Sequence, residues 1–151
     1  MKAIDVDLIK HWAEARERLH VALRTLNDSD LGYTPGAGLR TLGENISHIG
    51  MGEDFWLSIA KGTEFGSWDA AKNPELATVA GLTRRLNETH EASLAYLGNL
   101  EEARLEDTRK NRRGEDVTLS WIFWHVIEHE VHHRGEVYFA MGMHGTPPPG
   151  F

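Results

Sequence analysis

Histidines are concentrated in one part of the sequence, where four of the nine fall within residues 121–140. This stretch contains no proline, and its long apolar residues recur at the spacing of an α-helix. At about 100° per residue, His129 and His133 share one stripe with apolar residues, namely Ile122, Val126, Val137 and Ala140. A helix normally buries such a stripe. Two imidazoles four residues apart on a buried face can bind one metal ion, so we predict that His129 and His133 are metal ligands.

A metal ion in a protein needs three or four ligands, so a third must come from another part of the chain. His48 is the best candidate, because it lies in the middle of a predicted helix and at the edge of its apolar side. The pattern alone fits a hydrogen-bonded core histidine equally well. Three neutral imidazoles would leave a position for water or substrate, which is typical of catalytic rather than structural sites.

The other histidines are interpreted differently. His90 falls within an apolar stripe and is predicted to be a structural core residue. His125 and His132 lie roughly 60° to one side of the ligand stripe, so we assign them to its flank, either beside the site or on the surface. The remaining three carry no signal: His11, His20 and His144.

Residues 129–133 also match H-E-x-x-H, the helix motif of zinc proteases, in which the glutamate acts as general base. The match makes Glu130 a candidate catalytic base. A true zinc protease is disfavoured, because the only carboxylate after His133 is Glu136, on the same predicted helix. A di-iron site is rejected as well, since it needs a second E-x-x-H on another helix.

Composition excludes several classes of protein. The 151 residues suffice for a substantial core, and we predict a single domain over residues 1–151. A net charge of −7 argues against nucleic acid as a partner. With no cysteine, a metal must use imidazole, carboxylate or water. No apolar run is long enough to span a membrane and the N-terminal segment is not a signal peptide, so we expect a cytoplasmic protein.

Helical periodicity is clear in four segments, residues 5–26, 41–61, 73–100 and 118–143. Thr41 and Glu44 have the spacing of a capping box, and Asn73 before Pro74 is typical of a helix start. Residues 101–117 are polar and irregular, with room for a short extended piece. We predict an all-α four-helix bundle whose connectors are long enough for crossovers.

Two motifs resemble the DinB/YfiT-like superfamily. They are W-I-F-W-H-V-I-E-H-E-V-H-H-R-G-E-V at residues 121–137 and T-P-G-A-G-L-R-T-L-G-E-N-I-S-H-I at residues 34–49. The resemblance covers essentially the whole chain and implies a DinB/YfiT-like bundle with a divalent metal held by three histidines, His48, His129 and His133. It favours His48 as a ligand over a core role. The position of Glu130 is not fixed in that superfamily, which weakens the case for a base there, and Gly135 is expected to let a neighbouring helix approach closely.

Members of that superfamily with known activity are thiol transferases that use bacillithiol, mycothiol or glutathione, or related isomerases. Others are described as metal-dependent hydrolases, and homodimers are common. The resemblance therefore implies an enzyme that activates either a small-molecule thiol, as an S-transferase, or water, as a hydrolase. For the hydrolysis variant we consider Glu130 or Glu44 as the proton acceptor. Zinc or nickel is the expected ion, and iron, copper or manganese is also compatible. The alternatives are a non-enzymatic metal-binding stress-response module and a bundle whose histidines are merely packed.

Overall fold

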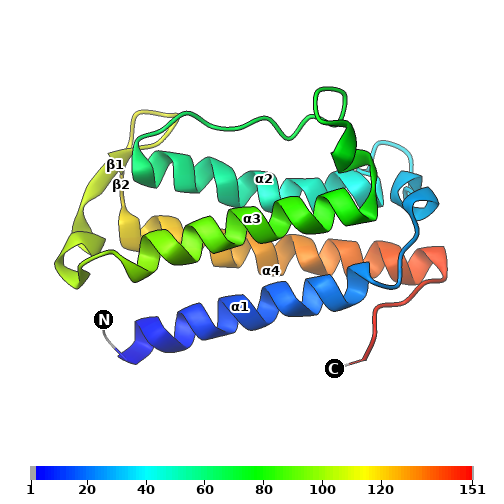
Figure 1. The fold of residues 1–151 in the computed structure, drawn as a ribbon, viewed down its shortest axis with the longest axis horizontal. Helices are drawn as coiled ribbons and strands as arrows, with labels where there is room; N and C mark the ends of the chain where they lie inside the picture. The colour runs from blue at the N-terminus through cyan, green and yellow to red at the C-terminus, as the bar shows by residue number, and fades with distance from the viewer. Residues whose placement is uncertain (1–2, 151) are drawn as a thin grey trace.

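Four long helices make up most of the structure, a computed structural model that describes residues 3–150 and the side chains of residues 7–150. They pack lengthwise into a bundle (Figure 1) and are α1 (Ala3–Leu23), α2 (Leu42–Lys61), α3 (Val79–Gly98) and α4 (Leu119–His144). Within residues 3–150 the only strands are β1 (Thr108–Lys110) and β2 (Asp116–Thr118), a short antiparallel hairpin. The predicted all-α four-helix bundle is confirmed.

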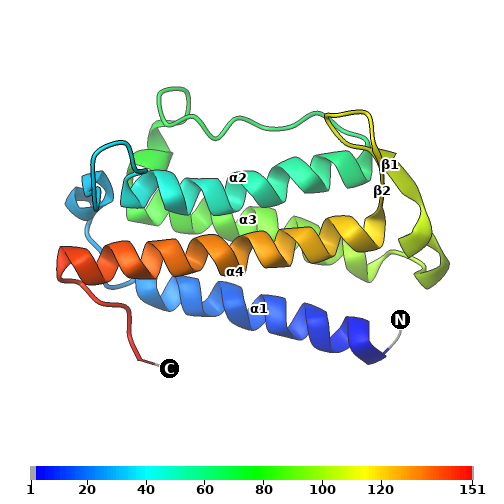
Figure 2. The same cartoon turned by 180° about the vertical axis from the view of Figure 1, so that it is seen from behind.

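The helices do not simply alternate in direction along the chain. Figure 1 shows α1 and α4 running one way along the bundle and α2 and α3 running the other way. The connection at residues 62–73 makes this arrangement possible, because it travels back along the outside of the bundle before α3 begins. Seen from behind, α4 lies between α2 and α1, so α2 and α4 are antiparallel neighbours (Figure 2).

The start of α2 follows the local sequence. The Thr41 hydroxyl accepts a hydrogen bond from the Glu44 N–H at 3.2 Å, and the Thr41 N–H donates to Glu44 Oε2 at 2.7 Å. This reciprocal pair confirms the predicted capping box and satisfies two N–H groups that the helix itself leaves free. The helix ends at Lys61, and Gly62 takes the left-handed backbone conformation that often follows a helix.

The predictions for the other boundaries need correction. Residues Pro74–Ala77 form a separate 3-10 turn, η2, and α3 begins only at Val79. Thr78 is the reason, because its hydroxyl accepts from the Gly81 N–H at 3.0 Å and so caps a new helix. The first helix ends at Leu23, three residues before the predicted position, and a 3-10 turn, η1 (Asp28–Gly32), follows. The hairpin and a further turn, η3 (Glu102–Glu106), occupy the segment predicted to be irregular.

Apolar side chains form two separate core clusters along the bundle. One is represented by Leu19, Ile49, Leu86 and Val137, and the other by Trp12, Leu57, Leu97 and Val126. On each helix one buried titratable residue lies between the positions that belong to the two clusters. These four residues, which we call the ionic layer, are Arg16, Glu53, His90 and Glu130.

Arg16 is the centre of the ionic layer. Its guanidinium donates to Glu53 Oε2 at 2.6 Å, to Glu130 Oε1 at 2.9 Å and to the Leu86 carbonyl at 2.8 Å. Nδ1 of His90 lies 3.2 Å from the second oxygen of Glu53. All four residues of the layer are at most 7% exposed. A single side chain of α1 is thereby bonded to each of the other three helices.

Ionisation of the layer follows from these contacts. Burial alone would lower the pKa of Arg16, but the carboxylates of Glu53 and Glu130 raise it above its usual value. Burial opposes ionisation of Glu53, yet Arg16 and His90 together hold the pKa of Glu53 below its ordinary range. The guanidinium and the Glu53 carboxylate are therefore charged, and each compensates the desolvation of the other.

None of the helices among residues 3–150 combines the length and the apolar character that crossing a membrane requires.

Replacing Arg16 by methionine is expected to lower the free energy of unfolding by about 3–5 kcal/mol, because two buried carboxylates lose their partner. The matched control is Arg24→Met. Arg24 pairs with Glu17 at 2.6 Å, but both side chains are more than 60% exposed, so its loss is expected to cost less than about 1 kcal/mol. Urea unfolding followed by circular dichroism measures both values. Similar losses for the two variants would contradict the importance assigned to the ionic layer.

Candidate metal centre

Three histidines from two helices converge on one side of the bundle. His48 lies on α2, and His129 and His133 lie one turn apart on α4. Nε2 of His48 is 3.2 Å from Nε2 of His129, and one ring nitrogen of each of the three residues lies within 4.8 Å of the others. All three side chains are partly buried. The structure thus brings together the three residues that the sequence predicts as ligands.

The spacing suits a shared metal ion. Zinc binds imidazole nitrogen at about 2.0–2.1 Å, which places two ligands of a tetrahedral ion about 3.3 Å apart. The observed 3.2 Å between the Nε2 atoms of His48 and His129 matches this separation. Two neutral rings could share a hydrogen bond at the same distance, but that bond does not account for the third ring. A set of three imidazoles leaves room in the coordination sphere for a further ligand.

Electrostatics keep two of these rings neutral. Burial lowers the pKa of His48 to about 4, and the positive charge of Arg40 and the neighbouring His133 add to this effect. Burial lowers the pKa of His129 to about 3, with further contributions from His133 and His48. Since a metal ion binds the unprotonated imidazole, His48 and His129 are ready to bind a metal near neutral pH.

Glu136 orients the third ring. Its Oε2 lies 2.7 Å from Nδ1 of His133, and its other oxygen lies 3.3 Å from Nε2 of His132. A hydrogen bond from His133 to this carboxylate places the ring proton on Nδ1 and leaves Nε2 free to bind a metal. Sequence reasoning noted Glu136 only as a carboxylate on the same helix. Its spacing of three residues from His133, which puts the two side chains together on a helix, was the signal for this role.

Gly52 makes room for His129. It follows His48 by one turn of α2, and the His129 ring lies directly against it. A Cβ at Gly52 would overlap Cε1 of His129 and would lie 2.7 Å from Nδ1. The expectation that Gly135 allows such an approach is wrong for the helices of this chain, because a Cβ at Gly135 would meet nothing within 4 Å among the described residues. The close contact between helices occurs instead at a glycine that the sequence analysis did not single out.

Glu130 lies in the ionic layer rather than among the three histidines. Its side chain is buried, and its two oxygens accept hydrogen bonds from Arg16 and from Nε1 of Trp12, the latter at 2.8 Å. A base must be able to reach the substrate, and both oxygens of Glu130 are already bonded to α1. A catalytic role for Glu130 stays a prediction, and these contacts favour a structural one.

The remaining histidines are dispersed. His90 is buried in the core, as predicted, and bonds Glu53. His125 stacks on Trp121 with the ring planes 8° apart, and its ring centroid lies 6.3 Å from that of His129. His132 is exposed and His20 is buried. Nε2 of His144 lies 2.9 Å from Asp30.

Two open grooves border the candidate centre. The first, which we call the His48 groove, has a volume of about 870 Å3 and is lined by His48, Met51 and Trp68 among others. The second, the Glu136 groove, has a volume of about 460 Å3 and is lined by His132, Glu136 and Phe139 among others. Pockets for small ligands typically measure about 300–1,000 Å3. Either groove could therefore accommodate a small molecule beside the histidines.

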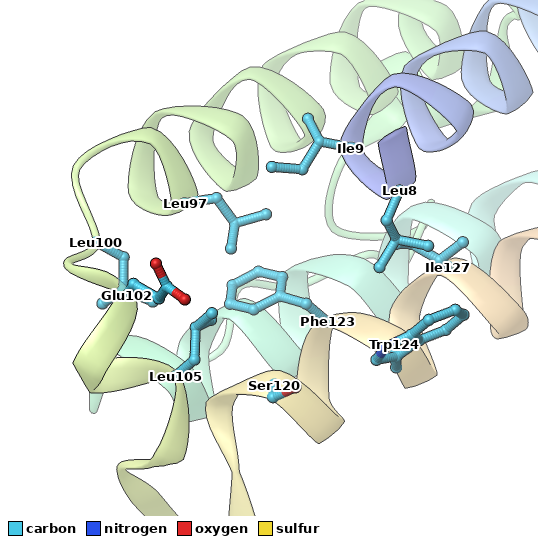
Figure 3. Close-up of a pocket in the computed structure, with 10 residues that line it drawn as sticks. All are labelled: Leu8, Ile9, Leu97, Leu100, Glu102, Leu105, Ser120, Phe123, Trp124 and Ile127. Atoms are coloured by element: carbon cyan, nitrogen blue, oxygen red, sulfur yellow. The ribbon is translucent and has the colours of Figure 1, made fainter. Parts of the chain in front are cut away.

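A more enclosed apolar cavity lies elsewhere, where α1, α3 and the start of α4 meet (Figure 3). Ile9, Leu97, Phe123 and Trp124 line it together with other, mostly apolar side chains, and its volume is about 40 Å3. This is far below the volume of a pocket for a small ligand. None of the three converging histidines lines it, so it is not part of the candidate centre.

The fold and the site define a four-helix bundle with a histidine cluster between its second and fourth helices. The sequence model of the DinB family matches residues 1–151, and the chain belongs to this family. No curated protein matches the sequence.

Solved structures are similar in fold. A DinB-like protein from Bacillus cereus superposes with a TM-score of 0.80 at 21% identity, covering 95% of each chain. A conserved protein from Enterococcus faecalis has a TM-score of 0.75 at 16% identity, covering 95% of this chain and 97% of the other. A DinB-like protein from Bacillus subtilis has a TM-score of 0.74 at 18% identity, covering 96% of each chain. At these identities the comparisons support the fold alone.

Replacing Gly52 by alanine is expected to weaken metal binding by about tenfold or more, because the added methyl group displaces the His129 ring from His48. The matched control is Gly142→Ala in α4, where a Cβ would meet nothing within 4 Å in the described chain. Both substitutions favour the helix, so a loss of helical propensity cannot explain a difference. Competition with a chromogenic chelator measures the affinities. Equal affinity in the two variants would show that the contact at Gly52 does not position the ligand.

The metal-free protein is expected to lose stability between about pH 7 and pH 5, because His20, His48 and His129 bind protons less readily when folded. Burial lowers the pKa of His20 to about 4, with Arg16 contributing. The unfolded chain therefore binds more protons below the ordinary histidine pKa, and stability falls. The carboxylates whose pKa values are lowered affect stability only at more acidic pH, below this range. Urea unfolding with chelator present measures the effect at both pH values.

His20→Leu should reduce the fall in the free energy of unfolding between pH 7 and pH 5, because His20 is buried. His11→Leu is the control and should leave this fall unchanged, because His11 is exposed. A free energy of unfolding that is the same at the two pH values would contradict the assignment of neutral buried rings.

Proposed function

We propose that His48, His129 and His133 bind one divalent metal ion. The observation that carries this proposal is the convergence of three imidazole nitrogens within 4.8 Å on a partly buried surface. Burying neutral imidazoles together without a partner is unfavourable, and a shared ion removes this cost. Zinc and nickel are the proposed ions, and a set of three imidazoles also suits iron or copper, with manganese a weaker match.

We propose that the bound metal serves catalysis. A divalent ion supplies a Lewis acid that lowers the pKa of a thiol or a water molecule held beside it. The chain's own residues prepare the site. Glu136 fixes the ring of His133, and Gly52 lets His129 lie close to α2. The Lewis acid and the rigid helical framework together favour an enzyme over a passive binding site.

Space for a substrate supports the same proposal. Both grooves are open; His48 lines the first, and Glu136, which bonds His133, lines the second. Glu44 lines the His48 groove, where its carboxylate also caps α2, and is the proposed proton acceptor that a substrate can reach. Glu130, the sequence-based candidate, lines neither of these grooves.

The proposed reaction is transfer of a small-molecule thiol to an electrophile, with hydrolysis by activated water as the nearest variant. The thiol has to be a separate small molecule, because the chain has no cysteine. Membership of the DinB family is compatible with this activity and supports the metal site in general terms.

We also propose that the protein acts as a homodimer in the cytoplasm. The outer face of α4 exposes large apolar side chains, namely Trp124, Val131, Phe139 and Met143, each 47–64% exposed. Gly135 and Gly142 lie on the same helix, and a Cβ at either would meet nothing within 4 Å in the described chain. Two antiparallel copies of this face could pack the large residues of one helix over the glycines of the other, as a two-fold dimer requires.

Protein expressed without a histidine tag is expected to retain about one equivalent of divalent metal through purification. His48→Ala, His129→Ala and His133→Ala should each reduce the content below about a tenth of an equivalent, because two imidazoles hold an ion weakly. The exposed His11 changed to alanine is the control and should retain the metal. Elemental analysis by mass spectrometry measures the content. Wild-type protein with less than about a tenth of an equivalent would overturn the metal site.

The metal-loaded protein should then be assayed for conjugation of thiols to generic electrophiles and for ester and amide hydrolysis. Turnover that disappears in His129→Ala would support the enzyme. Bound metal without turnover in either assay would favour the alternative, a non-enzymatic metal-binding module of the same fold.

A further inference from the structure

Arg40 lies where the two grooves beside the histidines meet. It directly precedes Thr41, the residue that caps α2, and so lies at the end of the loop that leads into that helix. Its side chain lines the His48 groove and also the Glu136 groove. Apart from Leu39, no other residue of the described chain lines both. A molecule in either groove would therefore lie near the Arg40 guanidinium.

The charge of Arg40 has no partner among the described side chains. Its side chain is exposed, and among residues 7–150 the guanidinium has no hydrogen bond and no ion pair. Other arginines are engaged, for example Arg16 with two carboxylates and Arg109 with the Ala60 carbonyl at 3.0 Å. An unpaired guanidinium presents several N–H donors in a planar arrangement that matches a carboxylate.

The acidic side chains that line the His48 groove do not neutralise this charge. Asp28 accepts a hydrogen bond from the Val79 N–H at 2.8 Å, and Asp69 accepts one from the Ala71 N–H at 2.9 Å. Glu44 accepts one from the Thr41 N–H. Each of these carboxylates supports a turn or a helix start, and none of them forms an ion pair with Arg40.

Arg40 is also close to the candidate centre. Arg40 and His48 both line the His48 groove. One small molecule could reach the histidines at one end and Arg40 at the other.

We propose that Arg40 binds the anionic group of the substrate, so that the preferred substrate carries a carboxylate in addition to the thiol. This inference rests on the proposed metal site for the thiol and adds the recognition of the carboxylate. A carboxylate and a guanidinium form paired, charge-assisted hydrogen bonds, which give orientation as well as affinity. Arg40 thereby selects mercapto acids over neutral thiols of the same length.

Binding of 4-mercaptobutanoate and of 4-mercaptobutanol to the zinc-loaded protein tests the proposal by calorimetry. The acid is expected to bind about fivefold more tightly than the alcohol, in keeping with a partly solvated charged hydrogen bond. Arg40→Gln should abolish this preference without changing the zinc content, and Arg40→Lys should retain part of it. Equal affinities for the two thiols in the wild-type protein would overturn the proposal.

The matched control is Arg113→Gln. Arg113 is also exposed, and its position between β1 and β2 is at the end of the bundle away from the start of α2 (Figure 1). This variant changes the net charge by the same amount and should keep the preference for the acid. If Arg113→Gln removed the preference as strongly as Arg40→Gln, general electrostatic attraction would replace the proposed subsite.

A second measurement separates this proposal from the metal site. Metal-free protein is titrated with butanoate while the backbone amide resonances of Arg40 and Thr41 are followed by nuclear magnetic resonance. Saturable shifts in the wild-type protein that are absent in Arg40→Gln would support the carboxylate subsite even if no metal bound. No shifts in the wild-type protein, together with normal zinc content, would refute the subsite and leave the metal site intact.

Discussion

The contact between Arg16 and two carboxylates determines how α2 and α4 lie against each other. Glu53 directly follows Gly52 on α2, and Glu130 directly follows His129 on α4. Both carboxylates bond one guanidinium, which fixes the position of each helix along the bundle axis. The His129 ring then lies against Gly52 and reaches His48 one turn away. A shift of one helix by a single turn, about 5.4 Å, would break the ionic contacts and at the same time move His129 away from His48.

This arrangement gives the ionic layer a role that an apolar layer could not have. Buried ion pairs often contribute little net stability, because desolvation cancels much of their attraction. The two apolar clusters on either side of the layer supply the burial that holds the bundle together. Apolar side chains tolerate alternative packing, whereas the bonds of Arg16 to Glu53, to Glu130 and to the Leu86 carbonyl can form in one register only. The charges of the ionic layer therefore fix how the helices are aligned along the bundle, and do not only add stability.

The sequence was informative where the signal is local. The four helices follow from periodicity, and the capping box at Thr41 follows from a spacing of three residues. The histidines that converge were also found, because His129 and His133 share a helical stripe and His48 lies in a recognisable motif. Pairings between distant residues could not be predicted. Arg16 and Glu130 are 114 residues apart, and the local sequence of one helix does not indicate which residue of the other helix it will contact. The glycine contact was missed for the same reason, since the need for space at Gly52 arises from a ring on a different helix.

The H-E-x-x-H match shows how one helical motif can be divided between two sites. Successive residues of a helix point about 100° apart, so Glu130 cannot share the direction of His129 and His133. In this bundle the two histidines meet α2, while the glutamate meets α1 through Arg16 and Trp12. In a zinc protease the two histidines bind the metal and the glutamate acts as general base, so the side of the helix that carries the glutamate must be open to the substrate. Here α1 occupies that side, so the position of the first helix separates the carboxylate from the histidines and directs it into the core.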